Sequence, residues 1–185
     1  MQKEIEAKAI KIDKDEIRKK LKESGCKLVF KEKKFVRKVY ELPSSSPFID
    51  KSGIWIRLRT DGESTDLTLK IFSEKMKWAK EMESEVKDFK IIGEILELSG
   101  FKQKGHQENL REKWINDKVE FCIDTWPMVD PWLEIEGPNE KTIKDWFKKL
   151  DLDYEKAYYG SSDVVYRDVY NLDIHLLNTL LLEDD

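Results

Sequence analysis

The sequence contains few cysteines, histidines, prolines and glycines. Among its 185 residues there are 2 cysteines, 2 histidines, 5 prolines and 8 glycines. Cys26 and Cys122 lie far apart and show no metal-site spacing, so we expect two free structural thiols in a reducing compartment and no disulfide framework. The two histidines have no histidine or cysteine neighbours, which argues against a zinc site.

The sequence also lacks long apolar runs and a glycine-rich phosphate loop. No apolar stretch approaches the roughly 20 residues of a membrane-spanning helix, and the chain begins with charged residues at Met1–Glu4. Residues 100–105 lack both the spacing and the following hydroxyl of a phosphate loop. The net charge of -4 gives no overall basic field for nucleic acid. We therefore expect a soluble, cytoplasmic protein that binds neither membranes nor nucleic acid.

Charged residues are abundant. They make up 39% of the sequence, well above the usual quarter, while apolar residues also reach 39% and aromatic residues 11%. This composition argues against disorder over most of the length. The length suits one domain with a sizeable core, so we predict a single domain over residues 1–185.

Short segments with alternating charged and apolar residues recur along the chain. In the first, Glu4, Glu6 and Lys8 share one face of an expected strand, and Ile5 and Ala7 share the other. An ordinary half-buried strand would turn its charges to water. The repetition favours a second interpretation, a closed sheet with a polar interior. The alternation returns at Arg57/Arg59, Thr68/Lys70, Glu83/Glu85, Asn109/Arg111/Lys113, Glu120/Asp124 and Glu134/Glu136.

The pattern predicts eight strands and several helices. A helix is expected from the capping box at Asp13 and Glu16 to Gly25, a second over 89–98, and a third over 139–150 with Asn139 as N-cap. One or two short helices are expected within 161–182; the leucines there indicate a packing face or a homodimer contact. Eight strands suit a small closed barrel. The strands are expected at 4–8, 34–42, 53–60, 66–72, 81–87, 107–115, 119–124 and 131–137.

Acidic and basic side chains facing one polar interior would form a costly network if they only paired with one another. A wet channel that binds a highly charged ligand removes this difficulty. Arginine and lysine suit phosphate oxygens, and paired carboxylates suit a hard cation such as Mg²⁺ or Mn²⁺. A metal-bound polyphosphate is therefore the expected ligand. The basic set is Lys8, Arg57, Arg59, Lys70 and Arg111, and the acidic set is Glu4, Glu6, Asp124, Glu134 and Glu136.

Taken in their order along the chain, the charged motifs resemble those of the CYTH family, also called the triphosphate tunnel metalloenzymes. The family includes class IV adenylyl cyclases, thiamine triphosphatases and inorganic triphosphatases. The resemblance begins at Glu4–Lys8 and ends at Leu133–Gly137, so it covers most of the chain. The motifs between them are Trp55–Arg59, Leu67–Lys70, Glu83–Glu85, Arg111 and Asp124.

The resemblance implies an α+β fold, in which helices flank a closed eight-stranded antiparallel barrel with a charged interior and the helices of 161–182 pack on the barrel. It also implies that the acidic set binds one or two metal ions and that the basic set binds the triphosphate. Trp55 resembles the position that stacks on thiamine in thiamine triphosphatases. Asn109 replaces a lysine common in the family, and Lys113 on the same face is the expected substitute. The expected catalytic residues are Glu4, Glu6, Lys8 and Glu85.

Three functions follow, in order of preference. A metal-dependent triphosphatase needs only the groups visible in the sequence. The roles of Glu83 and Glu85 stay open between binding metal, orienting the basic residues and holding a water. A class IV adenylyl cyclase, which converts ATP to cyclic AMP and pyrophosphate, would also need an adenine pocket that the sequence does not reveal. A noncatalytic polyphosphate-binding module would not need the paired carboxylates, so their presence argues against it.

Overall fold

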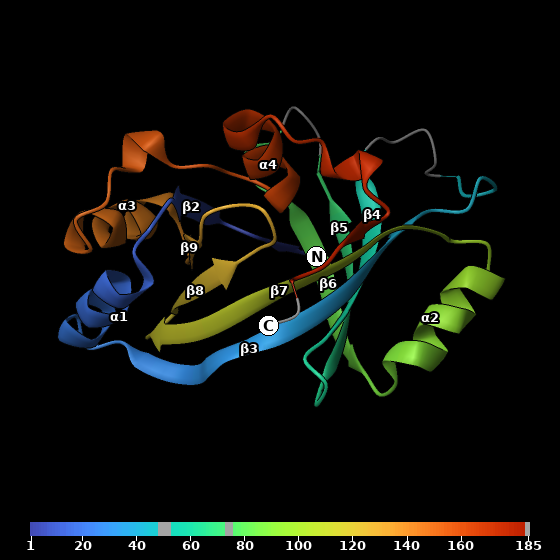
Figure 1. Ribbon diagram of the computed structural model, residues 1–185, viewed down its shortest axis with the longest axis horizontal. Coiled ribbons are helices and arrows are strands. Elements are labelled where there is room, and N and C mark those ends of the chain that lie inside the picture. Colours follow the sequence, from blue (N-terminus) through green and yellow to red (C-terminus); the bar gives the residue numbers. More distant parts are fainter. Residues whose placement is uncertain (48–52, 73–75, 184–185) are drawn as a thin grey trace. The chain divides into compact units, whose positions relative to one another are not determined.

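Antiparallel strands form the largest part of the secondary structure, and helices lie against them (Figure 1). The computed structural model describes residues 1–47, 53–72 and 76–183. These residues form ten strands, eight of which have five residues or more. The α+β class is therefore confirmed. The strands are β1 (Gln2–Lys3), β2 (Glu6–Ile10), β3 (Lys27–Glu41), β4 (Ile54–Thr60), β5 (Thr65–Ile71), β6 (Lys80–Val86), β7 (Lys102–Asn116), β8 (Val119–Thr125), β9 (Trp132–Glu136) and β10 (Thr179–Leu180).

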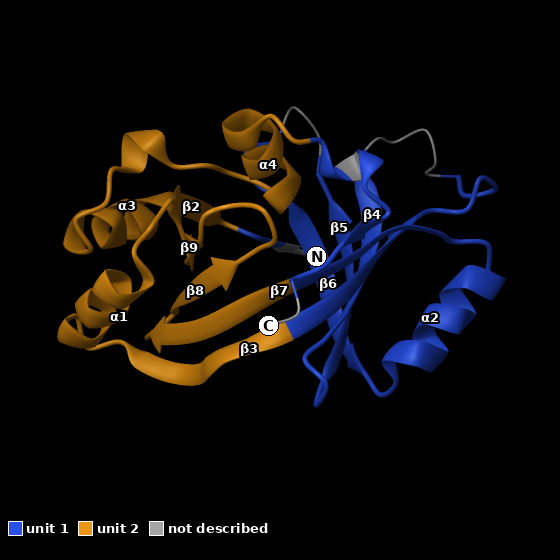
Figure 2. Ribbon diagram, in the orientation of Figure 1, with its two compact units in different colours: residues 1–4, 35–108, 173–185 blue, residues 5–34, 109–172 orange. Residues whose placement is uncertain are grey.

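The chain divides into two units (Figure 2). Unit 1 comprises residues 1–4, 35–108 and 173–185, and unit 2 comprises residues 5–34 and 109–172. The strand order is β1-β6-β5-β4-β3 in unit 1 and β7-β8-β9-β2 in unit 2. Strands β3 and β7 each contribute residues to both units. That the two units form one domain, and that the sheet closes into a barrel with a charged interior, stay predictions.

In unit 1, helix α2 (Phe89–Leu98) covers the apolar face of the sheet. Its Leu96 joins the buried side chains of Tyr40, Ile56 and Leu58. Gly93 lies in this contact, where a Cβ atom would sit 3.1 Å from the Tyr40 hydroxyl. Glycine therefore lets the helix approach the strands closely. Asp88 caps the helix by accepting a hydrogen bond from the Ile91 N–H at 2.9 Å.

In unit 2, helices α1 (Lys14–Glu23) and α3 (Glu140–Lys149) cover the apolar face of the sheet (Figure 1). Asp13 and Asn139 are the N-caps, as predicted, since their side chains accept hydrogen bonds from backbone N–H groups of the first turns. Each buried aliphatic or aromatic side chain in such a core contributes about 1.5–3 kcal/mol. The core includes Ala7, Ile17, Leu21, Phe121, Ile123, Leu133, Ile135, Ile143 and Phe147.

The remaining short elements lie in the last third of the chain. Helix α4 (Ser162–Tyr170) ends at Asn171, which adopts a left-handed conformation with φ of 53°. Two 3₁₀ turns cover Tyr154–Lys156 and Ile174–Leu176. None of the helices in the described ranges is long and apolar enough to cross a membrane.

Three differences from the sequence-based prediction concern the strands. The expected first strand is divided, because Glu4 N–H donates to Ala79 in unit 1 whereas the Ile5 carbonyl accepts from Gly137 in unit 2. Strands β3 and β7 begin earlier than predicted, at Lys27 and Lys102. The two-residue strands β1 and β10 were not predicted; β10 pairs in parallel with β7.

Candidate functional site

The pairing register of unit 1 places polar side chains in rows on one face of the sheet. Residues directly opposite each other in paired strands point to the same face. Arg59 therefore lies between Arg37 of β3 and Asp66 of β5. On its other side, Asp66 lies opposite Glu85 of β6. The two parallel rows are Val39–Arg57–Thr68–Glu83 and Glu41–Trp55–Lys70–Glu81. The polar face predicted for these strands is thus present within unit 1.

The basic side chains of this face contact carboxylates. Lys70 lies between two of them, because its Nζ atom is 2.7 Å from Glu4 Oε1 and 3.4 Å from Glu81 Oε2. Lys70 therefore holds together the carboxylates of two separate segments. The arginine contacts are Arg57 Nη2 to Glu83 Oε2 at 3.2 Å and Arg59 Nη2 to Asp66 Oδ2 at 3.2 Å.

Glu83 is the acceptor at the centre of unit 1's polar face. Thr68 Oγ1 donates to Glu83 Oε2 at 2.8 Å, and Arg57 Nη2 donates to both residues at 3.2 Å. Burial raises the pKa of Glu83, but the Thr68 hydrogen bond and the Arg57 charge outweigh it, so the pKa is lowered. Arg57 Nε is buried and has no hydrogen-bond partner among the described residues. The guanidinium of Arg57 thus retains a donor for an incoming acceptor.

Glu81 was not among the predicted site residues. Burial, and then the nearby charge of Glu4, raise the pKa of its carboxyl group, while Lys70 opposes them. Glu81 belongs to the same two-residue alternation as Glu83 and Glu85, so extending that pattern by one step would have identified it.

Unit 2 has a polar face built in the same way. Glu136 of β9 lies opposite Glu6 of β2 and Glu120 of β8. This places three carboxylate residues in one row, and like charges directly opposite one another are unfavourable unless a cation compensates them. The next two rows run Lys113–Cys122–Glu134–Lys8 and Arg111–Asp124–Trp132–Ile10.

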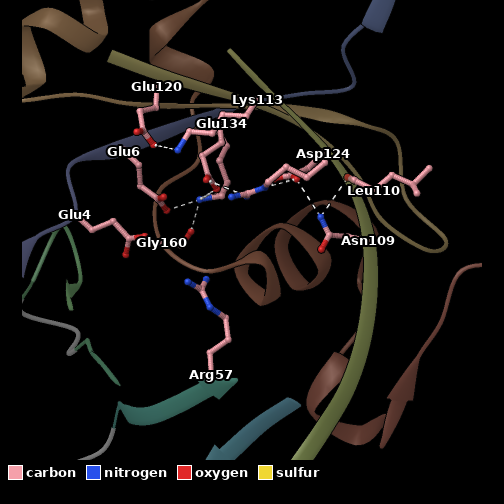
Figure 3. Close-up of polar contacts among 12 residues, drawn as sticks. Glu4, Glu6, Arg57, Asn109, Leu110, Lys113, Glu120, Asp124, Glu134 and Gly160 are labelled. Atoms are coloured by element: carbon pink, nitrogen blue, oxygen red, sulfur yellow. Dashed lines mark hydrogen bonds and ion pairs between the residues drawn. The ribbon is translucent and has the colours of Figure 1, made fainter. Parts of the chain in front are cut away.

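Lys8 of this face is 3% exposed, and three residues that contact its ammonium group, Glu6, Glu134 and Gly160, are labelled in Figure 3. Its ammonium group donates to Glu6 Oε1. It also donates to the Gly160 carbonyl, at 2.7 Å, and lies 3.1 Å from Glu134 Oε2. Burial lowers the pKa of Lys8, but Glu134 and then Glu6 raise it by more, so the pKa is raised and the group stays charged. A backbone bridge between Lys8 and Tyr158 holds the neighbouring loop against β2.

Arg111 forms the second ion-pair centre of this face, and its partners Asp124 and Glu134 are labelled in Figure 3. Its Nε and Nη2 atoms donate to the two Asp124 oxygens at 2.7 and 2.6 Å, and Nη2 also contacts Glu134 Oε1 at 3.1 Å. Burial lowers the Arg111 pKa, whereas Asp124 and other nearby groups raise it well above the usual value. Asn109, fully buried, donates to Asp124 Oδ1 at 3.0 Å. Asn109 therefore helps to orient Asp124 in this structure.

Lys113 and Glu120 form a more exposed pair at the rim of the same face. Their Nζ and Oε2 atoms are 2.7 Å apart, with side-chain exposures of 27% and 38%. Cys122 lies opposite Lys113 and Glu134 and is buried. Burial raises the pKa of the Cys122 thiol to about 12.

This raised pKa predicts an inert thiol. In a Cys26→Ser variant, where only Cys122 remains, the fraction of thiolate at pH 8 would be on the order of one in ten thousand. We expect reaction with a thiol-specific disulfide reagent to be at least about a hundredfold slower in native protein than in guanidinium-denatured protein. Reaction of the native variant at the denatured rate would contradict the buried position of Cys122.

The structure brings the predicted residues together within each unit. The polar face of unit 1 carries Trp55, Arg57, Arg59, Lys70 and Glu85, and Glu4 also contacts Lys70 there. The polar face of unit 2 carries the rest of the predicted set: Glu6, Lys8, Arg111, Lys113, Asp124, Glu134 and Glu136. Within the described ranges, no group of three histidine, cysteine, aspartate or glutamate side chains is placed to hold a metal ion. The metal-ligand set stays a prediction.

Comparison with known proteins identifies a family. A model of the CYTH domain matches residues 2–167. No curated protein matches the sequence. A solved structure of a Pyrococcus horikoshii protein is similar, with 24% identity, a TM-score of 0.69, and coverage of 84% of this chain and 94% of that chain.

Two further solved structures share the fold. A candidate adenylate cyclase from Vibrio parahaemolyticus has 12% identity and a TM-score of 0.73, covering 92% of this chain and 99% of that chain. A candidate adenylyl cyclase from Hippeastrum, described as having a dominant triphosphatase activity, has 16% identity and a TM-score of 0.56, covering 89% and 95%. The family model spans most of the sequence, including both polar faces, and the chain therefore belongs to the CYTH domain family.

Proposed function

We propose that this chain is a divalent-metal-dependent triphosphatase. The substrate class is a compound with a triphosphate group, such as tripolyphosphate, a nucleoside triphosphate or thiamine triphosphate. Members of the CYTH family act on triphosphates, and the Hippeastrum neighbour is described as a triphosphatase. The closed tunnel of the family, with charged residues on its inner wall, is part of this proposal.

The charge balance of unit 2's polar face carries the proposal. Around Lys8 and Arg111, the three carboxylates of Glu6, Asp124 and Glu134 outnumber the two cations. A polyphosphate would be repelled by this net negative charge if it arrived alone. The same group attracts a divalent cation together with its phosphate ligand. The excess of carboxylates over basic groups therefore favours a metal-dependent reaction over simple anion binding.

The donor chemistry of the acidic residues fits Mg²⁺ or Mn²⁺, since both ions prefer carboxylate oxygens. Glu6 and Glu136 lie opposite each other, and Glu134 is the next residue of β9 on the same face. Their side chains do not form a ligand cluster in this structure, and we propose that these three residues converge on the metal when it binds. Glu4 and Asp124 stay predicted ligands. When bound, the metal would neutralise phosphate charge and polarise the P–O bonds.

The basic residues would hold the triphosphate. Lys8 and Arg111 both contact Glu134, so a cation that binds this carboxylate would leave part of their charge for phosphate oxygens. Arg57 would donate through its buried Nε atom, with Glu83 and Thr68 fixing its orientation. Such positioning and charge neutralisation provide most of the catalysis in phosphoryl transfer. Glu85 is proposed to orient the attacking water.

A product assay tests the proposal. The protein is incubated with Mg²⁺ or Mn²⁺ and tripolyphosphate, thiamine triphosphate or ATP, while orthophosphate, pyrophosphate and cyclic AMP are measured. We expect orthophosphate release that requires the metal and stops on chelation. Cyclic AMP and pyrophosphate as main products from ATP would identify a cyclase instead. Tight binding without turnover would identify a noncatalytic module.

The proposed role of Arg57 gives a separate prediction. Arg57→Ala should raise KM for the triphosphate by about tenfold or more, because a charge-assisted, oriented donor is lost. Arg167→Ala removes an exposed arginine on α4 and serves as the matched control, with KM unchanged. Equal KM values for the two variants would remove Arg57 from substrate binding.

A further inference from the structure

Trp132 lies on the polar face of unit 2, where the other residues of β9 on that face, Glu134 and Glu136, carry carboxylates. It precedes Glu134 by two residues in β9, and it lies opposite Asp124 of β8 and Ile10 of β2. The alternation of the strand therefore sends its side chain to the same face as Glu134. The residue is 1% exposed.

Neighbouring aromatic rings fix the Trp132 ring. Trp126 stacks on it with a centroid distance of 5.7 Å and an interplanar angle of 21°. Tyr166 of α4 meets Trp126 edge to face at 6.4 Å, and its hydroxyl donates to the Pro127 carbonyl at 2.6 Å. Tyr166 holds Trp126, and Trp126 stacks on Trp132. The direction of the Trp132 indole N–H is therefore set before any ligand binds.

This indole N–H has no hydrogen-bond partner among the residues that the structure describes, although the nitrogen is buried. Buried donors are almost always satisfied, because leaving one unpaired costs stability. Trp114 in the same unit follows this rule, since its indole N–H donates to Glu112 Oε1 at 2.6 Å. Trp132 differs from Trp114 because its buried, oriented indole N–H has no acceptor among the described residues.

The groups around Trp132 indicate what the acceptor is. Asp124, directly opposite Trp132, receives two hydrogen bonds from Arg111, and Arg111 also contacts Glu134. An anionic acceptor that arrives together with its metal would be favoured beside this guanidinium. A neutral indole donor can bind an anionic oxygen without adding to the buried charge.

We propose that the Trp132 indole N–H donates a hydrogen bond to a phosphoryl oxygen of the substrate, at the Arg111 end of unit 2's polar face. This assignment rests on the proposed triphosphate substrate. It makes Trp132 a substrate-binding residue whose contribution is orientation. The stacked Trp126 and the edge-on Tyr166 keep the donor in place.

Binding measurements on matched variants test the assignment. Affinity for a methylene-bridged, nonhydrolysable triphosphate analogue with Mg²⁺ is measured by titration calorimetry. Trp132→Phe keeps an aromatic ring but removes the donor, and it should raise Kd by about five- to tenfold. Trp146→Phe, on α3 at the opposite face of the sheet, is the control and should leave Kd within about twofold. An unchanged Kd for Trp132→Phe would mean that water satisfies the N–H, and it would overturn the assignment.

A second measurement uses the unmodified protein. The ¹⁵N-labelled chain contains 6 tryptophan indole groups, and the Trp132 signal can be assigned from contacts with Trp126 even where the variant does not fold. We expect this signal to move downfield and its hydrogen exchange to slow when the analogue binds. Binding with an unmoved signal would overturn the assignment and leave the triphosphatase intact. Binding with a moved signal but no tripolyphosphate hydrolysis would overturn only the triphosphatase, and absence of binding would overturn both.

Discussion

Replacing both Glu6 and Glu136 with glutamine is expected to lower metal-dependent phosphate release at least about a hundredfold and to leave the chain folded. The two carboxylates lie directly opposite each other on neighbouring strands, so removing their charges relieves a repulsion. Lys8 keeps its contacts with Glu134 and Gly160. Glutamine retains the shape of glutamate but is a much weaker ligand for a hard divalent cation.

Phosphate release is measured over a range of Mg²⁺ concentrations, together with the thermal unfolding midpoint. The matched control is Glu16→Gln with Glu23→Gln, two exposed positions on α1, which should change neither quantity. A variant that keeps its unfolding midpoint but loses turnover supports the metal assignment. Turnover within twofold of the unmodified chain at every Mg²⁺ concentration would remove Glu6 and Glu136 from the mechanism.

The second large effect concerns stability. Arg111→Met should lower the free energy of unfolding by about 3–5 kcal/mol, because it leaves the buried carboxylate of Asp124 without its cation. Asp124 is 1% exposed and would keep only the Asn109 amide as a side-chain donor among its described contacts. Methionine fills much of the volume of the arginine stem, so the loss reports the missing charge more than a cavity.

Urea denaturation measures this loss, with two comparisons. Lys141→Met removes the cation of an exposed pair with Asp145, whose side chains are 87% and 65% exposed, and should have no measurable effect. The double variant Arg111→Met with Asp124→Leu should recover part of the lost stability, because the unpaired charge is gone. If Arg111→Met were as stable as Lys141→Met, the ion pair would not be a buried, coupled one.

Much of the fold follows from local patterns. Helix α2 was predicted with its observed bounds, and the caps at Asp13 and Asn139 were correct. Cap residues act through backbone groups only two or three positions away, so a short window of sequence contains the whole interaction. The face assignment of β2 was also correct, since Ala7 and Ala9 lie in the core and Lys8 lies on the polar face. Alternation is a property of the strand itself.

Other features depend on information that no short window contains. The first part of β3 was not predicted, because its residues Leu28 and Val29 are 41% and 52% exposed and stand among lysines, which hides the usual burial signal. Ion-pair partners depend on pairing register between distant strands, as for Lys70 with Glu4. The role of Asn109 as a donor to Asp124 likewise required the register of β7 and β8.

Strand β2 has a consequence for the order of events on the ribosome. It is translated well before its partner strand in unit 2, β9, which comprises residues 132–136. Until those residues are translated, the nascent chain carries Glu6 and Lys8 on a strand that has no ladder to join, and unpaired strands invite association with other chains. The alternating charges of this strand then oppose association between nascent chains, a role separate from the binding role that we propose for them.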